Sequence, residues 1–176
     1  WSCPFLLSEQ TTPQTISVNI DQPGLICLAK TWLDHAKEDA KCIDGYNNFW
    51  CHRKKRIRGG VGILTSDKLT VTKLTSHTTS TFSAVLILLH LLNVPVIVGC
   101  VYHPPNADNN TTLNYLLDTM LKLLQKRPNA HFIVTGDLNQ LPISNLIEQC
   151  NLKNLVNFDT RNDAMLDHII LTDINE

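Results

Sequence analysis

The chain has 176 residues, of which 43% are hydrophobic and 18% are charged, and its formal net charge at pH 7 is −1. This composition indicates one ordinary globular domain, residues 1–176, with enough apolar residues to bury a core. The small net charge excludes a general electrostatic attraction to nucleic acid, so any such binding has to come from a local patch.

The six cysteines are widely spaced and include no Cys-x-x-Cys pair, so their pattern does not indicate a zinc site. Cys27 and Cys100 lie in apolar runs, which predicts buried, reduced thiols and an intracellular location, in the nucleus or cytoplasm. The longest apolar run, 84–92, is too short to cross a bilayer, so no membrane association is expected. The chain starts with Trp1 rather than Met, which indicates a piece of a longer reading frame.

The first half of the chain predicts a series of strands. Apolar, aromatic and β-branched residues bounded by turn residues predict strands at 25–28, 46–51, 61–64 and 68–74. A Ser/Thr-rich connection is expected at 76–83. Two long apolar runs, 84–92 and 94–101, suit adjacent central strands that are buried on both faces.

Strands and helices alternate in the second half. Apolar residues at helical spacing predict a helix over 111–126, capped by Thr111 or Thr112. A buried strand is expected at 132–134, and Pro142 suits the first turn of a second helix. The last expected strands are 155–158 and 166–171. This order predicts an α/β fold with a mixed sheet.

The most informative stretch is 131–141, which reads HFIVTGDLNQL. Gly136 ends its apolar run, and Asp137 and Asn139 follow at the carboxyl end of the expected strand, where sites collect in α/β sheets. A carboxylate at that place can orient a water or hold a cation, and an amide can bind a phosphate oxygen. The alternative is a strand end followed by an Asx turn.

One segment of the chain, 52–58 with the sequence HRKKRIR, is densely basic and directly precedes two glycines. Its residues Arg53, Lys54, Lys55 and Arg56 form either a solvated hairpin loop or a loop that contacts phosphates. The sequence alone leaves both interpretations open.

Four polar segments, each expected to follow a strand, occur in an order and spacing that resemble the endonuclease/exonuclease/phosphatase family. They are Ala29-Lys30-Thr31-Trp32-Leu33, Tyr102-His103-Pro104-Pro105, Gly136-Asp137-Leu138-Asn139 and Leu166-Asp167-His168. More narrowly, the chain is similar to the apurinic-type endonuclease domain of LINE-type (non-LTR) retrotransposon polyproteins. The resemblance covers nearly the whole chain and implies a four-layer α/β sandwich with two mixed β-sheets between helices.

The resemblance also implies an activity, Mg²⁺-dependent hydrolysis of a phosphodiester in DNA, and a role for each motif residue. Asp137 would orient or deprotonate the attacking water, and Asn139 would hold a phosphate oxygen and help to fix Asp137. Tyr102 would bond the scissile phosphate, and Asp167 would orient a catalytic histidine. DNA and a reverse transcriptase domain in the same polyprotein are the implied partners, and we expect a monomer.

Two of these residues also have structural interpretations. Tyr102 could be a core aromatic residue with a hydrated hydroxyl group. Asp167 could simply pair with neighbouring backbone or with His168.

The chain departs from the family pattern in three places. Lys30 occupies the position of the family's metal-binding glutamate, and an ammonium cannot ligate Mg²⁺, which demands oxygen ligands. Ser2 and Pro4 stand where the family has asparagine and arginine. The sequence stops before the family's closing Ser-Asp-His segment, and His168 cannot supply that histidine because it directly follows Asp167, on the opposite face of a strand.

Three hypotheses follow. The chain is the DNA endonuclease domain of a retroelement with impaired activity, or a pseudoenzyme that binds nucleic acid or phosphate without catalysis, or another phosphodiesterase or phosphatase acting on phospholipid or inositol phosphates. The context of Trp32 and the loop that starts at Tyr102 argue against the third. We also expect Lys30 to lie beside Asp137 and partly to replace the cation.

Overall fold

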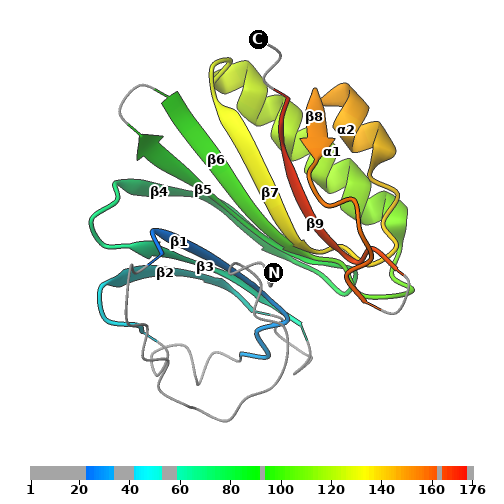
Figure 1. Cartoon of the computed structure of the whole chain (residues 1–176), viewed down its shortest axis with the longest axis horizontal. Coiled ribbons are helices and arrows are strands. Elements are labelled where there is room, and N and C mark those ends of the chain that lie inside the picture. Colours follow the sequence, from blue (N-terminus) through cyan, green and yellow to red (C-terminus); the bar gives the residue numbers. More distant parts are fainter. Residues whose placement is uncertain (1–22, 34–41, 53–58, 92–93, 162–163, 174–176) are drawn as a thin grey trace.

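The computed structural model describes residues 23–33, 42–52, 59–91, 94–161 and 164–173. Its elements form two β-sheets and a layer of helices (Figure 1). In chain order they are β1 (Leu25–Ala29), β2 (Tyr46–Cys51), β3 (Val61–Ser66), β4 (Val71–Thr78), β5 (Ser83–Leu91), β6 (Val94–Tyr102), α1 (Asn109–Lys126), β7 (His131–Asp137), α2 (Ser144–Gln149), β8 (Leu152–Asn154) and β9 (Asp167–Thr172). None of the described helices is long and apolar enough to cross a membrane.

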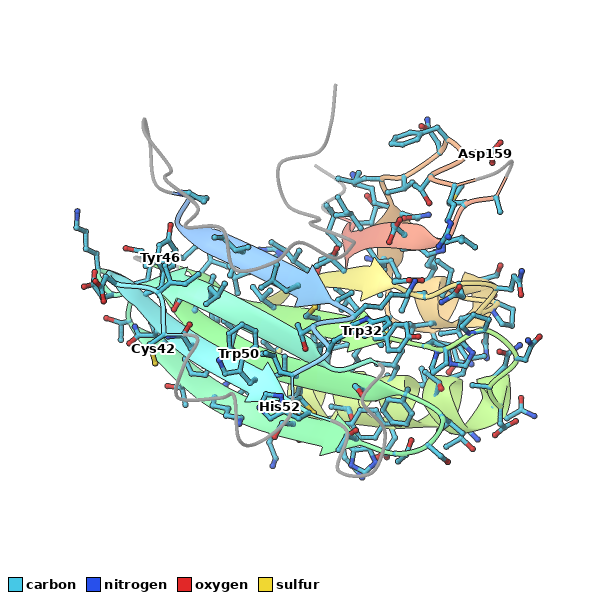
Figure 2. All side chains as sticks on the ribbon, turned by 90° about the horizontal axis from the view of Figure 1, so that it is seen from below. Trp32, Cys42, Tyr46, Trp50, His52 and Asp159 are labelled. Atoms are coloured by element: carbon cyan, nitrogen blue, oxygen red, sulfur yellow. The ribbon has the colours of Figure 1, made fainter. Side chains whose placement is uncertain are left out.

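The smaller sheet has the order β1-β3-β2 and is antiparallel. Gly62 lies in its central strand, directly under the ring of Trp50, where a Cβ atom would come within 2.1 Å of the ring carbons. Trp50 and His52 lie together on this sheet (Figure 2), with 6.5 Å between their ring centroids. The aromatic strand β2 therefore pairs closely with β3 because position 62 carries no side chain.

The larger sheet has the order β4-β5-β6-β7-β9-β8. It is mixed, because β6 and β7 run parallel while the other pairs are antiparallel. Helix α1 provides the crossover that a parallel pair requires. The antiparallel pairing of β7 with β9 places the end of β7 and the start of β9 at the same edge of the sheet.

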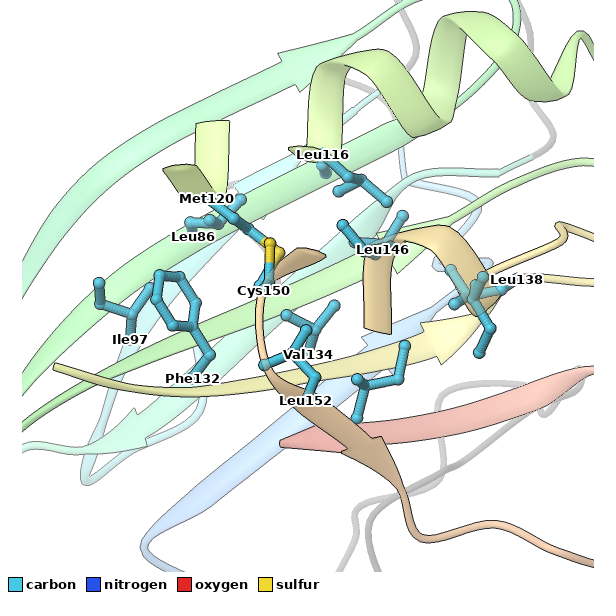
Figure 3. Close-up of a cluster of buried hydrophobic side chains, with 14 of the residues drawn as sticks. Leu86, Ile97, Leu116, Met120, Phe132, Val134, Leu138, Leu146, Cys150 and Leu152 are labelled. Carbon is cyan, nitrogen blue, oxygen red and sulfur yellow. The ribbon is translucent and has the colours of Figure 1, made fainter. Parts of the chain in front are cut away.

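Two hydrophobic clusters cover the two faces of the larger sheet. On one face, the helices pack against the sheet through residues such as Met120, Phe132 and Leu146 (Figure 3). On the other face, side chains such as Ile63 and Cys100 fill the space between the two sheets. This is the expected α/β sandwich with two sheets, and its described residues form three layers, with no described helix outside the smaller sheet.

Four local predictions are wrong. Pro142 lies before the second helix, because α2 (Ser144–Gln149) begins after its N-cap Ile143. Strand β4 runs from Val71 to Thr78, beyond the predicted 68–74 and into the expected connection, because its threonine-rich end pairs with β5. The predicted strand 155–158 is a loop in which Phe158 is 62% exposed, and the short strand β8 precedes it. Helix α1 is capped by Asp108, whose carboxylate accepts a hydrogen bond from the Thr111 backbone N–H at 2.8 Å.

Candidate functional site

Three of the four motif side chains lie on neighbouring strands of the larger sheet. Tyr102 is the cross-strand partner of Asp137 in the parallel pair, and Asp167 is its partner in the antiparallel pair. Direct cross-strand partners point to the same face of a sheet, and Tyr102 lies in the cluster between the two sheets. The strand pairing therefore gathers Tyr102, Asp137 and Asp167 at one edge, facing the smaller sheet. Asp167 opens β9 instead of following a strand, and it reaches this edge because β9 runs antiparallel to β7.

Gly136 sets the direction in which Asp137 leaves the strand. Its φ is +138°, and a Cβ atom at this position would lie 1.9 Å from the carbonyl oxygen of Val101 on β6. Beyond it, the His103 N–H donates to the Asp137 carbonyl at 2.9 Å. The close approach of β6 and β7, which brings Tyr102 and Asp137 side by side, thus requires glycine at position 136.

Lys30 reaches the site from the other sheet. It directly follows β1, which pairs with β3 in the smaller sheet and packs against β6 and β7 of the larger sheet. Lys30 and Trp32 both have a φ of +54°. Backbone hydrogen bonds hold this loop, from Thr31 N–H to the Gly60 carbonyl at 3.2 Å and from Trp32 N–H to the Gly59 carbonyl at 2.9 Å. Left-handed residues other than glycine cost roughly 1–2 kcal/mol each and collect at functional sites.

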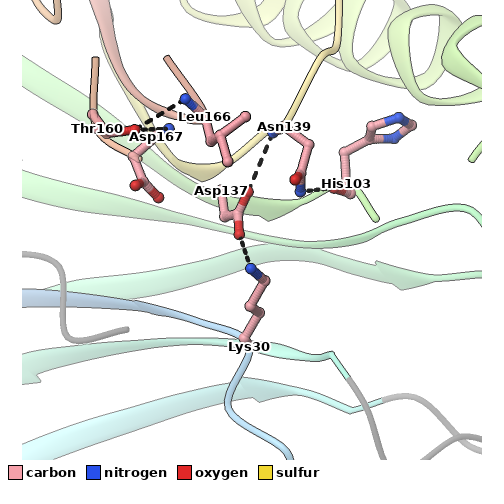
Figure 4. A network of polar contacts seen from close by, with 7 residues as sticks. All are labelled: Lys30, His103, Asp137, Asn139, Thr160, Leu166 and Asp167. Atoms are coloured by element: carbon pink, nitrogen blue, oxygen red, sulfur yellow. Dashed lines mark hydrogen bonds and ion pairs between the residues drawn. The ribbon is translucent and has the colours of Figure 1, made fainter. Parts of the chain in front are cut away.

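The ammonium of Lys30 forms an ion pair with Oδ2 of Asp137 (Figure 4). The Asp137 side chain is 7% exposed and that of Lys30 is 25% exposed. The ammonium also lies 5.7 Å from the ring centroid of Tyr102, within the range of a cation–π interaction. The expected placement of Lys30 beside Asp137 is confirmed.

Asn139 holds the second oxygen of Asp137 through its main chain. Its backbone N–H donates to Asp137 Oδ1 at 3.2 Å, and its side-chain Nδ2 donates to the His103 carbonyl at 2.6 Å. Its φ of +49° permits this turn. Both carboxylate oxygens of Asp137 are therefore engaged, one by Lys30 and one by the Asn139 backbone.

Asp167 is positioned by a residue that the sequence interpretation missed. The Thr160 hydroxyl oxygen accepts hydrogen bonds from the N–H groups of Leu166 at 3.0 Å and Asp167 at 3.1 Å. Burial and the nearby Asp137 carboxylate raise the pKa of Asp167, while the hydrogen bond to Thr160 and the positive charge of Lys30 act against this shift. Thr160 lies outside every periodic segment, so its sequence position carries no signal of this role.

Two buried histidines near the site have structural partners. His103 bonds Thr112 through Nδ1 and Asn109 through Nε2, each at 3.0 Å, which ties its loop to α1. His168 accepts a hydrogen bond at Nδ1 from Asn154 Nδ2 at 3.1 Å. Burial lowers the pKa of both histidines, although the Asp137 charge acts in the opposite direction on each.

This lowered pKa predicts a loss of stability in mild acid. The unfolded chain takes up protons on its histidines below about pH 6.5, whereas the folded chain resists protonation until a lower pH, so the free energy of unfolding falls as the pH drops through this interval. Protonation of His168 would also place an N–H against the amide of Asn154. We expect the midpoint of thermal unfolding to drop between about pH 7 and pH 5.5, and less steeply in His168→Gln.

The control for this prediction is the exposed His90, whose replacement by glutamine should leave the pH slope unchanged. An equal slope in the His168→Gln variant and the unmodified chain would show that His168 is not responsible.

The residues at the site do not fit a divalent cation in the arrangement that they adopt. The Lys30 ammonium contacts the Asp137 oxygen that would face such an ion, and the second oxygen accepts from the Asn139 N–H. Across the part of the chain that the structure describes, no three His, Cys, Asp or Glu side chains are grouped as metal ligands.

The basic residues 53–56, and with them Ser2 and Pro4, lie outside the described residues.

Comparisons with known proteins give the family and the fold of the chain. The model of the endonuclease/exonuclease/phosphatase family matches residues 14–173. The endonuclease domain of TRAS1, a telomere-specific non-LTR retrotransposon, has a similar structure, with a TM-score of 0.63 and 14% identity over 85% of this chain and 73% of that chain. Truncated TDP2 from Caenorhabditis elegans matches with a TM-score of 0.62 and 15% identity over 85% and 71% of the two chains.

A third similar structure is TDP2 from D. rerio complexed with a single-strand DNA product, with a TM-score of 0.60 and 14% identity over 85% of this chain and 71% of that one. No curated protein sequence matches the chain. Identities this low show a shared fold, while the family model covers most of the sequence. The chain belongs to the endonuclease/exonuclease/phosphatase family.

Proposed function

We propose that this chain derives from the DNA endonuclease domain of a retroelement, that it still binds DNA, and that its hydrolytic activity is impaired. The observation that carries the proposal is the ion pair between Lys30 and Asp137. Hydrolysis of a phosphodiester needs an oriented water and positive charge on the phosphate oxygens. Here the carboxylate that would orient the water has both oxygens engaged.

Binding makes fewer demands on the site than hydrolysis. The Tyr102 hydroxyl can donate to a phosphate oxygen, and the second N–H of the Asn139 amide can do the same while the first stays on the His103 carbonyl. Binding of a phosphodiester in its ground state gives no acceleration, so these groups support recognition without turnover.

A DNA ligand is favoured by the comparisons and by the sequence. One similar structure is the endonuclease domain of a non-LTR retrotransposon, and another was solved with a single-strand DNA product. Within this chain, residues Arg53, Lys54, Lys55 and Arg56 are the densest positive segment. Because the net charge is −1, we propose that this segment supplies most of the attraction to DNA phosphates.

The test is the binding of a labelled DNA duplex, measured by fluorescence anisotropy in EDTA at several salt concentrations. Alanine at positions 53, 54, 55 and 56 should weaken binding to unrelated DNA sequences alike, by about tenfold or more, and should flatten the salt dependence. Each contact between a basic side chain and a phosphate releases counterions from the DNA when the protein binds. A variant with fewer contacts releases fewer counterions, so its affinity depends less on the salt concentration.

A matched control removes the same charge elsewhere. Lys68, Lys73, Lys122 and Lys126 are exposed, and their replacement by alanine should change binding less than the loop variant does. Equal losses in the two variants would mean that the segment 53–56 is only a solvated loop. Absence of DNA binding by the unmodified chain would refute the proposed function.

A further inference from the structure

Two carboxylates of the site lie on directly paired strands. Asp137 and Asp167 are direct cross-strand partners on β7 and β9, and Asp137 is almost fully buried. Like charges at such positions repel, and burial strengthens the repulsion. The charge of Asp137 is one of the causes of the raised pKa of Asp167. A positive charge close to these side chains offsets the repulsion, and the charges of Lys30 and Arg161 both act on Asp167 in this sense.

The structure supplies that cation from its own sequence. The Lys30 ammonium contacts Asp137, and its charge also acts on Asp167. Its loop is fixed by the Gly59 and Gly60 carbonyls, so the ammonium is held at this place by backbone contacts as well as by charge. Figure 4 shows the side chain extending from the smaller sheet to the carboxylate across the space between the sheets.

We propose that Lys30 is a tethered cation that occupies the place of a divalent ion at Asp137, so that the folded domain is indifferent to divalent ions and gains a site for them only when Lys30 is replaced. The inference rests on the proposed function for the assignment of this site. It goes further by predicting which ion the site will accept. Removal of the ammonium would leave two adjacent carboxylates, and a glutamate at position 30 would add a third, which together form an oxygen-rich set that suits Mg²⁺ or Mn²⁺.

The test is thermal unfolding of the purified chain in EDTA, in Mg²⁺ and in Mn²⁺, without DNA. The unmodified chain should unfold at the same temperature in all three. Lys30→Glu should unfold at a lower temperature in EDTA, by about 3 °C or more, and either divalent ion should restore most of the loss. Lys30→Gln should respond in the same direction but less, because it leaves two carboxylates.

Two controls make the result specific. Lys122 forms an ion pair with Asp118 on the surface of α1, so Lys122→Glu creates the same change of charge away from the site and should show no divalent response. Adding Asp137→Asn to Lys30→Glu should abolish the response. Two results would overturn the proposal. One is an unfolding temperature of the unmodified chain that divalent ions raise and that Asp137→Asn makes insensitive to them. The other is an unfolding temperature that divalent ions raise in neither Lys30 variant.

Folding failure has a defined meaning in this experiment. A Lys30 variant that refolds only with divalent ions supports the proposal, and failure of both variants to refold in every buffer contradicts it. Loss of DNA binding with the divalent response intact would refute the proposed function and leave this inference standing.

Discussion

Replacement of Gly136 by alanine is expected to destabilise the fold strongly. The added Cβ would lie 1.9 Å from the Val101 carbonyl oxygen, which belongs to a buried backbone and cannot rotate away. A φ of +138° is in addition a conformation that alanine rarely adopts. Relief would require β6 and β7 to separate at the centre of the larger sheet. We expect a loss on the order of 4 kcal/mol or more, against a typical net stability of about 5–15 kcal/mol.

The matched control for this prediction is Gly99, which lies in β6 beside the same strand. A Cβ atom there would make ordinary contacts at 3.5 Å with Leu86 and Val134. Gly99→Ala should therefore fold, and chemical denaturation should give it a stability close to that of the unmodified chain. Comparable stabilities for Gly136→Ala and Gly99→Ala would show that the β6–β7 approach tolerates a side chain at position 136.

The fold could be predicted from the sequence where burial is strong. The apolar runs that became β5 and β6 are buried on both faces, so their composition marks them clearly. The errors fall where that signal is weak. The second half of β4 is rich in polar β-branched residues on an edge strand, and two of the apolar residues that suggested a strand at 155–158, Leu155 and Phe158, are exposed.

The site could be predicted in part because its residues come from strand ends. Asp137, Tyr102 and Asp167 meet through strand pairing, and motif order was sufficient to associate them. The Asn139 N–H bonds the Asp137 carboxylate two residues back, which is the Asx turn that the sequence offered as an alternative at this strand end. The bond between Thr160 and the backbone of Asp167 could not be derived from the sequence, because it depends on loop geometry that no residue pattern encodes.

The second prediction concerns the rate of DNA cleavage by the unmodified chain. A bound cation contributes several kcal/mol to the stabilisation of a phosphoryl-transfer transition state, which corresponds to roughly a thousandfold or more in rate. In this chain the Lys30 ammonium is paired with one Asp137 oxygen, and the other oxygen is bonded to the Asn139 N–H. Entry of an ion or of an attacking water therefore requires Lys30 to leave a partly buried ion pair. We expect the unmodified chain to cleave DNA no faster than a variant without the Asp137 carboxylate.

The nicking of supercoiled plasmid in Mg²⁺ is the most direct measurement of this claim. Purified unmodified chain and Asp137→Ala are incubated side by side at matched concentrations, and the conversion of supercoiled to open-circular plasmid is followed over time. Binding of the same plasmid, measured in parallel, shows that both proteins are folded and engaged with DNA. We predict equal, background-level conversion by the two proteins. Clear nicking by the unmodified chain that Asp137→Ala abolishes would contradict the account, because it would show that Lys30 gives way to a working catalytic arrangement.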